Sequence, residues 1–269
     1  MHISRLPFAE RVSHPAFYGI SALLFAASAA LTIAWCTSMS AMHAMPMPGG
    51  WTMSMTWMRM PGQTWSGAAA SFLGMWIVMM MAMMLPSLVP MLRRYRRSIG
   101  AITDARLGWL TAIVSAGYFL VWTVFGTVAF PLGVALAAIE MQRPALAEAV
   151  PIAAGVVVLA AGALQLSAWK TRQLACCRET LRHGCTLPPD AVAAWRHGLY
   201  LGLRCCYCCA GLTAILLVIG VMDLGAMAIV MAAITAERLM PRGERVARAV
   251  GVVIGGAGLF LIARAIGLG

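Results

Sequence analysis

Long apolar stretches alternate with short polar ones along this chain, and most of the apolar stretches have the length of a membrane-crossing helix. At about 1.5 Å of rise per residue, roughly 20 apolar residues cross the hydrocarbon core of a bilayer. The pattern therefore predicts an all-α, polytopic transmembrane helix bundle of about seven spans. The predicted spans are residues 17–35, 66–92, 107–130, 151–169, 198–222, 224–240 and 249–266.

Three local features refine this prediction. Pro131 and Gly133 are expected to end the third span, so that residues 134–150 form a short amphipathic hairpin. Glu237 and Arg238, at the end of the sixth span, are expected to pair with each other and to reach toward the membrane surface. The glycines of the last span favour close packing against another helix.

Composition and charge agree with a membrane protein. Hydrophobic residues make up 61% of the 269 positions and charged residues 11%, and the mean hydropathy is +0.83. An ordinary soluble domain contains far more charge. The net charge of +11 comes from arginines between apolar stretches, so nucleic acid is not expected as a partner. We predict that residues 1–269 form a single integral membrane domain in the lipid bilayer.

The distribution of basic residues predicts the orientation of this domain. If the N-terminus lies inside, sixteen of the 20 arginines and lysines fall on the cytoplasmic side and three on the other side. The positive-inside rule then favours an N-in, C-out topology. Residues 36–65 become a Met-rich extracytoplasmic loop, and residues 170–197 become a cytoplasmic loop that contains cysteine and histidine.

Four of the eight cysteines fall within five residues, at the start of the fifth predicted span. On a helix, Cys205, Cys208 and Cys209 share one face, and Cys206 lies beside Cys209. Thiolates bind soft ions such as Cu(I) and borderline ions such as Zn(II), and this spacing lets three sulfurs converge on one ion. We expect a metal site here, with Arg204 favouring the thiolate form. The alternative is that these cysteines only fill space in an apolar helix.

The predicted cytoplasmic loop contains further candidate ligands. Cys176 and Cys177 are adjacent, and His183, Cys185 and His197 follow them. A second metal site is one interpretation, although adjacent cysteines chelate one ion awkwardly and the spacing matches no standard zinc pattern.

In residues 36–65 methionine recurs every two or three positions, and prolines and glycines exclude a continuous helix. Thioethers prefer Cu(I) to Zn(II) and do not form disulfides. The candidate ligands are Met42, His43, Met45 and Met47. The sequence favours a loop that collects soft metal ions, and a hydrophobic cap over the helix ends is the alternative.

The second predicted span is also rich in methionine. Met75, Met79 and Met83 recur at every fourth position, and Met80 and Met84 form a second row beside them. Met79 and Met83 are candidate ligands of a metal relay. Packing is the alternative, because methionine commonly fills gaps between helices.

Several motifs occur in order between residues 71 and 264. They are the Met-rich run 76–90, Cys177-Arg178, Cys205-x-x-Cys208-Cys209, Gly220-Val221-Met222-Asp223-Leu224 and Glu237-Arg238. In combination they resemble a bacterial family of uncharacterised membrane proteins described as predicted metal-binding integral membrane proteins. The resemblance implies metal binding by Cys205, Cys208 and Cys209, and the cytoplasmic (inner) membrane of a bacterium is the expected location. The chain departs from the family pattern at Gln173, where cysteine is usual, and at Asp223, where asparagine is usual.

Three functions remain open at this point. The first is a Cu(I)-handling membrane protein for transport, transfer or cuproprotein assembly, with a metallochaperone or cuproenzyme as partner and Zn(II) as the alternative metal. The second is a membrane thiol-disulfide oxidoreductase that uses the C-x-x-C-C motif. The third is a non-catalytic structural subunit, and a homo-oligomer is compatible with each. The sequence contains no serine-histidine-acid set, phosphate loop or paired catalytic carboxylates, so an enzyme is the less favoured class.

Overall fold

The computed structural model of the chain describes residues 8–40, 45–59, 62–99, 102–179 and 188–267. Eight α-helices make up most of these residues, which confirms the all-α prediction. The helices are α1 (Phe8–Ser40), α2 (Trp65–Ser98), α3 (Asp104–Gln142), α4 (Pro144–Leu166), α5 (Ala168–Glu179), α6 (Ala191–Ile219), α7 (Leu224–Leu239) and α8 (Gly243–Ala265). Between α1 and α2 lie the strands β1 (Met45–Pro46) and β2 (Thr52–Met53) and the 3-10 turn η1 (Met55–Trp57).

Six of the described helices are long and apolar enough to cross a membrane: α1 over Pro15–Met39, α2, α3, α4, α6 and α8. The predicted sixth span corresponds to α7, whose 16 residues extend about 24 Å, less than the roughly 30 Å hydrocarbon core. The Asp223 carboxylate accepts a hydrogen bond from Ala226 N at 2.8 Å and caps the start of α7, and a proline follows its C-cap residue. Six helices, rather than about seven, therefore have the length and composition of a span.

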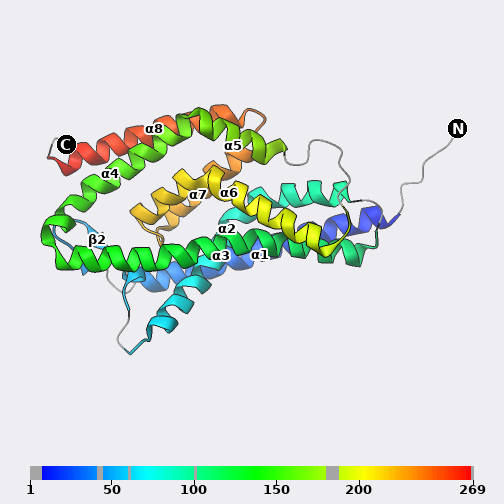
Figure 1. The fold of residues 1–269 in the computed structure, drawn as a ribbon, viewed down its shortest axis with the longest axis horizontal. Coiled ribbons are helices and arrows are strands. Elements are labelled where there is room, and N and C mark those ends of the chain that lie inside the picture. The colour runs from blue at the N-terminus through cyan, green and yellow to red at the C-terminus, as the bar shows by residue number, and fades with distance from the viewer. Residues whose placement is uncertain (1–7, 41–44, 60–61, 100–101, 180–187, 268–269) are drawn as a thin grey trace.

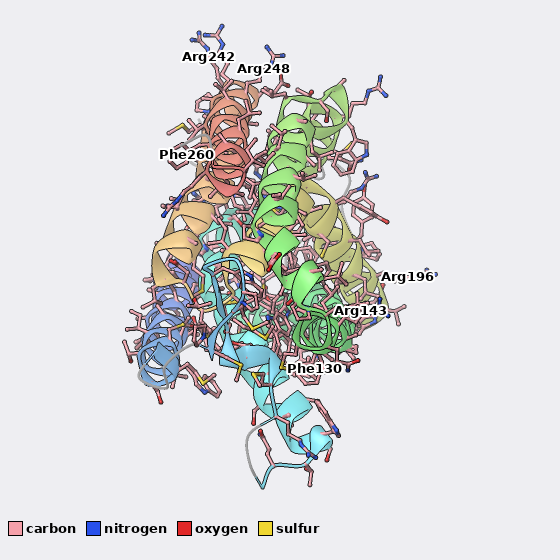
Figure 2. The ribbon with its side chains drawn as sticks, turned by 90° about the vertical axis from the view of Figure 1, so that its left-hand side faces the viewer. Phe130, Arg143, Arg196, Arg242, Arg248 and Phe260 are labelled. Atoms are coloured by element: carbon pink, nitrogen blue, oxygen red, sulfur yellow. The ribbon has the colours of Figure 1, made fainter. Side chains whose placement is uncertain are left out.

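Large apolar side chains cover the outside of the helices. Ile229 and Val253 are each 71% exposed, and Phe260 lies on the outer side of α8 (Figure 2). Figure 2 also shows Arg242 and Arg248 extending away from the helices at one end of α8. Soluble monomers rarely expose large continuous apolar surfaces. The outer surface is therefore suited to contact with lipid tails.

Helix α3 differs from its prediction because it continues without a break through Pro131. The proline removes one backbone hydrogen bond. Two residues later, Gly133 lets the Trp57 ring pack directly on the helix, where a Cβ would overlap the ring. The chain turns instead at Arg143 (φ −130°, ψ 91°), and a proline begins α4. The predicted hairpin at 134–150 is therefore wrong, since these residues end α3 and begin α4.

The fourth predicted span divides into two helices at Ser167, which has an extended backbone (φ −74°, ψ 152°). The Ser167 hydroxyl accepts a hydrogen bond from Lys170 N at 3.2 Å and so caps the start of α5. Helix α5 and the first turns of α6 occupy much of the segment 170–197 that was expected to be a loop. Its candidates His183 and Cys185 lie outside the described residues. The change of direction at Ser167 places Lys170 inside the bundle, where it is 2% exposed.

The Met-rich segment folds against the helices. Strands β1 and β2 pair antiparallel. Trp51 donates its ring N–H to Ala147 O of α4 at 2.8 Å, and the Trp57 ring lies 5.3 Å from that of Phe72 on α2. This packing agrees with a hydrophobic cap, but Met45 remains 38% exposed at the surface. Both sequence interpretations of the segment therefore stay open.

Helices α4 and α8 lie side by side along much of their length (Figure 1). A Cβ at Gly162 would lie 2.6 Å from Gly255 N, and a Cβ at Gly258 would lie 2.6 Å from Leu159 N. Glycine therefore lets the two backbones approach closely, which confirms the packing predicted for the last span.

Gly162→Leu is expected to lower the free energy of unfolding by about 1–3 kcal/mol, because the added side chain would overlap the α8 backbone. The measurement is the unfolding transition of the purified protein in detergent. Gly256→Leu is the matched control, since a Cβ at Gly256 meets nothing within 4 Å. Equal destabilisation of both variants would contradict a role for the close approach.

Candidate metal centre

Helices α3 and α6 cross closely because glycines of α6 face the α3 backbone. A Cβ at Gly198 would overlap Val114 O, and a Cβ at Gly202 would lie 2.9 Å from Tyr118 O. This crossing places the Tyr118 hydroxyl 2.9 Å from Cys205 Sγ, to which it donates a hydrogen bond. The glycines thus bring a hydroxyl donor to the thiols of α6.

Cys205, Cys209 and Met84 bring their sulfur atoms together in the core. Cys205 Sγ lies 3.9 Å from Cys209 Sγ and 3.8 Å from Met84 Sδ. All three residues are at most 1% exposed. Sulfurs bound at about 2.3 Å to one tetrahedral ion lie roughly 3.8 Å apart, so this spacing is compatible with ligands that share an ion.

Cys208 and Cys177 extend the group. Cys208 is 3% exposed, and Cys177 of α5 is 2% exposed. Cys177 Sγ donates to Arg204 O at 3.3 Å, and its thiol interacts electrostatically with that of Cys208. The neighbouring Cys208 thiol and burial together raise the pKa of the Cys177 thiol above its ordinary value. The thiol centre, as we call it, consists of Cys177, Cys205, Cys208, Cys209 and Met84.

A buried ion pair lies beside the thiol centre. Lys170 Nζ is 2.7 Å from Glu237 Oε2, and both side chains are 2% exposed. Lys170 also donates to Cys208 O at 2.7 Å, and Gln165 donates to the other Glu237 oxygen at 2.6 Å. Each charge is therefore compensated by a partner, as burial requires.

Arg238 directs its guanidinium at the thiol centre. It donates to Cys209 Sγ at 3.6 Å and to Ser87 Oγ at 3.2 Å, and it is 6% exposed. A cation and a hydroxyl donor close to sulfur stabilise the thiolate relative to the thiol. Within the described residues, the buried charged side chains are Lys170, Glu237 and Arg238, and all three lie at this one place.

One sequence prediction about charged residues is wrong. Glu237 pairs with Lys170 of α5 rather than with Arg238, and all three side chains are buried instead of reaching the membrane surface. Adjacent residues on a helix point about 100° apart, so Glu237 and Arg238 meet different partners. Arg204 donates to Gln173 Oε1 at 3.3 Å, and its guanidinium also interacts electrostatically with the Cys176 and Cys177 thiols. At Cys209 the guanidinium that donates to sulfur is that of Arg238.

The structure brings together four of the six cysteines predicted as ligands. Cys176 and Cys206 are half-buried next to the thiol centre, and no described cysteine forms a disulfide bond. His197 stacks on Tyr95 with ring centroids 5.3 Å apart. Among the described residues, no three His, Cys, Asp or Glu side chains are grouped closely enough to hold a metal ion. A site in this arrangement must therefore use the Met84 thioether or a small movement of the thiols.

The predicted methionine ligands lie in two environments. Met79 and Met83 are 2% and 3% exposed on α2, the helix that also carries Met84. Met45 is exposed and Met47 is half-buried in the hairpin segment. The other two candidates in that segment, Met42 and His43, lie outside the described residues. A ligand role for all of these residues stays a prediction.

Sequence analysis missed Met84, Tyr118 and Lys170 as parts of the site. The sequence offered a clue to Met84, because this residue belongs to the second row of methionines in its predicted span. Lys170 is the only lysine of the sequence, which could have marked it, but its position at the end of an apolar stretch suggested a surface charge. Nothing in the sequence marked Tyr118, because its contact with Cys205 arises only where α3 and α6 cross.

The fold and the site define a helical protein with six helices long enough to cross a membrane and a buried, sulfur-rich candidate centre for a soft metal. The chain belongs to the PpoB2 copper chaperone family, whose model matches residues 73–261. The matched range contains the whole thiol centre and the buried charges beside it. This match confirms the metal-handling part of the predicted resemblance and specifies copper. No curated protein and no solved structure matches the chain significantly.

Proposed function

We propose that this protein is an integral membrane Cu(I) carrier that holds the ion at the thiol centre and passes it to a copper-dependent protein. The observation that carries the proposal is the distance of Cys205 Sγ from Cys209 Sγ (3.9 Å) and from Met84 Sδ (3.8 Å) in the core. Thiolates and thioethers are the ligands that select Cu(I). Membership of a copper chaperone family supports copper as the cargo.

Charge balance favours Cu(I) over Zn(II). Lys170, Glu237 and Arg238 together carry one net positive charge. Cu(I) bound by two thiolates carries one net negative charge, so the loaded centre is neutral. Zn(II) reaches the same neutrality only with a third thiolate, so a site with two thiolates favours Cu(I) in the apolar interior. Zn(II) is therefore the alternative cargo and Cu(I) the proposed one.

The proposed setting is a lipid bilayer, the cytoplasmic membrane of a bacterium. Six apolar helices and an apolar outer surface support membrane integration. In this setting the short helix α7 carries Glu237 and Arg238 into the interior of the bundle. Ionisable residues within a membrane are expensive and commonly mark a functional site, which agrees with their position at the thiols.

Ligands of graded strength provide a route for the ion. The buried thioethers of Met79 and Met83 lie on the helix that leads to Met84. Neutral thioethers hold Cu(I) less tightly than anionic thiolates, so the ion moves from methionine toward the thiol centre. Cys177, next to the half-buried Cys176 on α5, supplies a thiol from which a metallochaperone or cuproenzyme receives the ion.

Met84→Leu tests the centre with little disturbance of packing, because leucine and methionine have similar volumes. The variant is expected to bind Cu(I) roughly tenfold to a hundredfold more weakly, since one soft ligand is lost. Affinity is measured by anaerobic competition with a Cu(I) chelator, and X-ray absorption counts the sulfur neighbours of the bound ion. Both measurements use the full chain in detergent.

Met91→Leu is the matched control, because Met91 lies on the same helix at 9% exposure and outside the thiol centre. It should retain the wild-type affinity for Cu(I). An unchanged affinity in Met84→Leu, or tighter binding of Zn(II) than of Cu(I) by the wild type, would contradict the proposal.

A further inference from the structure

A second group of sulfur atoms lies where the end of α1 meets the turn between α6 and α7. Cys36 Sγ is 3.8 Å from Met222 Sδ, and Cys36 is 2% exposed. The two residues are 186 positions apart in the sequence, so only the fold brings them together. Their separation equals the 3.8 Å between Cys205 and Met84 in the thiol centre.

Met222 also lines a cavity of about 230 Å³ between α1, α2 and the Met-rich segment. Three further methionines line this cavity: Met39 of α1, Met58 of the Met-rich segment and Met75 of α2. The remaining described residues that line it are aromatic, aliphatic or neutral polar, with no carboxylate and no imidazole among them. The Cys36 site, as we call it, consists of Cys36, Met39, Met58, Met75 and Met222.

This set of donors matches a soft monovalent ion. One thiol and several thioethers select Cu(I), whereas Zn(II) and harder ions require nitrogen, oxygen or several thiolates. One oxygen of the nearby Asp223 carboxylate accepts a hydrogen bond from Ala226 N at 2.8 Å and caps the start of α7. Methionine side chains are flexible, so those around the cavity can turn their sulfur atoms toward an ion.

Helix α2 connects the Cys36 site with the thiol centre. Met75 lines the cavity, and Met84, nine positions later and about 13 Å further along the helix, belongs to the thiol centre. The methionines between them, Met79, Met80 and Met83, are at most 3% exposed. Buried thioethers therefore fill the distance between the two groups of sulfur atoms.

We propose that the Cys36 site is a second Cu(I) site, at which the ion enters before it moves along α2 to the thiol centre. This inference rests on the proposed copper function, but it concerns separate residues and is tested separately. One thiol with neutral thioethers binds Cu(I) more weakly than several thiolates do. Weaker binding suits a site that passes its ion on.

The variant in which Cys205, Cys208 and Cys209 are all replaced by serine isolates the Cys36 site. It is expected to retain about one Cu(I) per chain, with only sulfur neighbours in X-ray absorption. Adding Cys36→Ala should weaken this remaining binding by more than roughly tenfold. Cu(I) is added to the purified full chain in detergent under anaerobic conditions, and a melting curve verifies folding.

The copper content of the single variant Met222→Leu is a second test of the Cys36 site, and it does not depend on the triple variant. In the presence of a chelator that binds Cu(I) less tightly than the intact Cys36 site does, copper content should fall from about two ions per chain in the wild type to about one in the variant. Met141→Leu is the matched control, because Met141 is 47% exposed on α3 and lies outside both sites.

A folded triple variant that binds no Cu(I) would overturn the Cys36 site, and so would wild-type copper content in Met222→Leu. In both cases tight Cu(I) binding by the wild type would still support the thiol centre. If the wild-type protein does not bind Cu(I) at all, the proposed function itself is overturned.

Discussion

Replacing Cys205, Cys208 and Cys209 with serine is expected to abolish the tightest Cu(I) site, with an affinity loss of more than about a hundredfold. Serine is close to cysteine in size, but its hard oxygen replaces the soft sulfur that Cu(I) prefers. The first measurement is elemental analysis of detergent-purified protein expressed with copper and zinc both supplied. Chelator competition then gives the affinity for Cu(I).

Cys206→Ser is the matched control, because Cys206 lies in the same turn of α6 and is half-buried outside the thiol centre. This variant should keep the wild-type copper content, and a loss of copper would show that the thiol centre is defined incorrectly. A wild-type protein that is free of copper and contains a reducible disulfide would contradict the copper proposal. Thiol-disulfide exchange would then be the better account.

Glu237→Gln is expected to lower the free energy of unfolding by about 3–5 kcal/mol, because it leaves the Lys170 ammonium buried without its counter-charge. The measurement is the unfolding transition in detergent. Glu244→Gln, at the exposed first turn of α8, is the matched control and should change stability by less than about 0.5 kcal/mol.

Combining Lys170→Met with Glu237→Gln should recover much of the lost stability, because both charges leave the interior together. The net charge beside the thiols is unchanged in this double variant, so Cu(I) binding should persist. If the double variant Lys170→Met with Glu237→Gln is as unstable as Glu237→Gln alone, the broken ion pair is not the cause of the lost stability.

Arg238→Gln removes the net positive charge and should weaken Cu(I) binding by at least roughly tenfold.

Most helices could be predicted because helix length and apolar content are local properties of the chain. Helices α2, α6 and α8 contain their predicted spans almost completely. The continuation of α3 through Pro131 could not be predicted, because it is accompanied by packing of Trp57, from a different segment, against Gly133. The division at Ser167 was missed for a similar reason, since one extended residue and a side-chain cap redirect the chain within an apolar stretch.

Part of the candidate site could also be predicted from the sequence. Spacing alone places Cys205, Cys208 and Cys209 on one face of a helix, and the structure buries all three. The other members depend on contacts between distant segments. Cys205 is 121 positions from Met84 and 87 positions from Tyr118, so neither neighbour follows from helix periodicity.

The sequence by itself determined an all-α chain with long apolar helices, a run of thiols on one helix face and a helix rich in methionine. Only the tertiary structure decided that Lys170, Glu237 and Arg238 lie inside, and that Cys36 meets Met222. Helix formation and helix faces depend on neighbours within a few residues. Burial of a charge depends on the partner that a distant segment supplies, and that partner is fixed only when the helices pack.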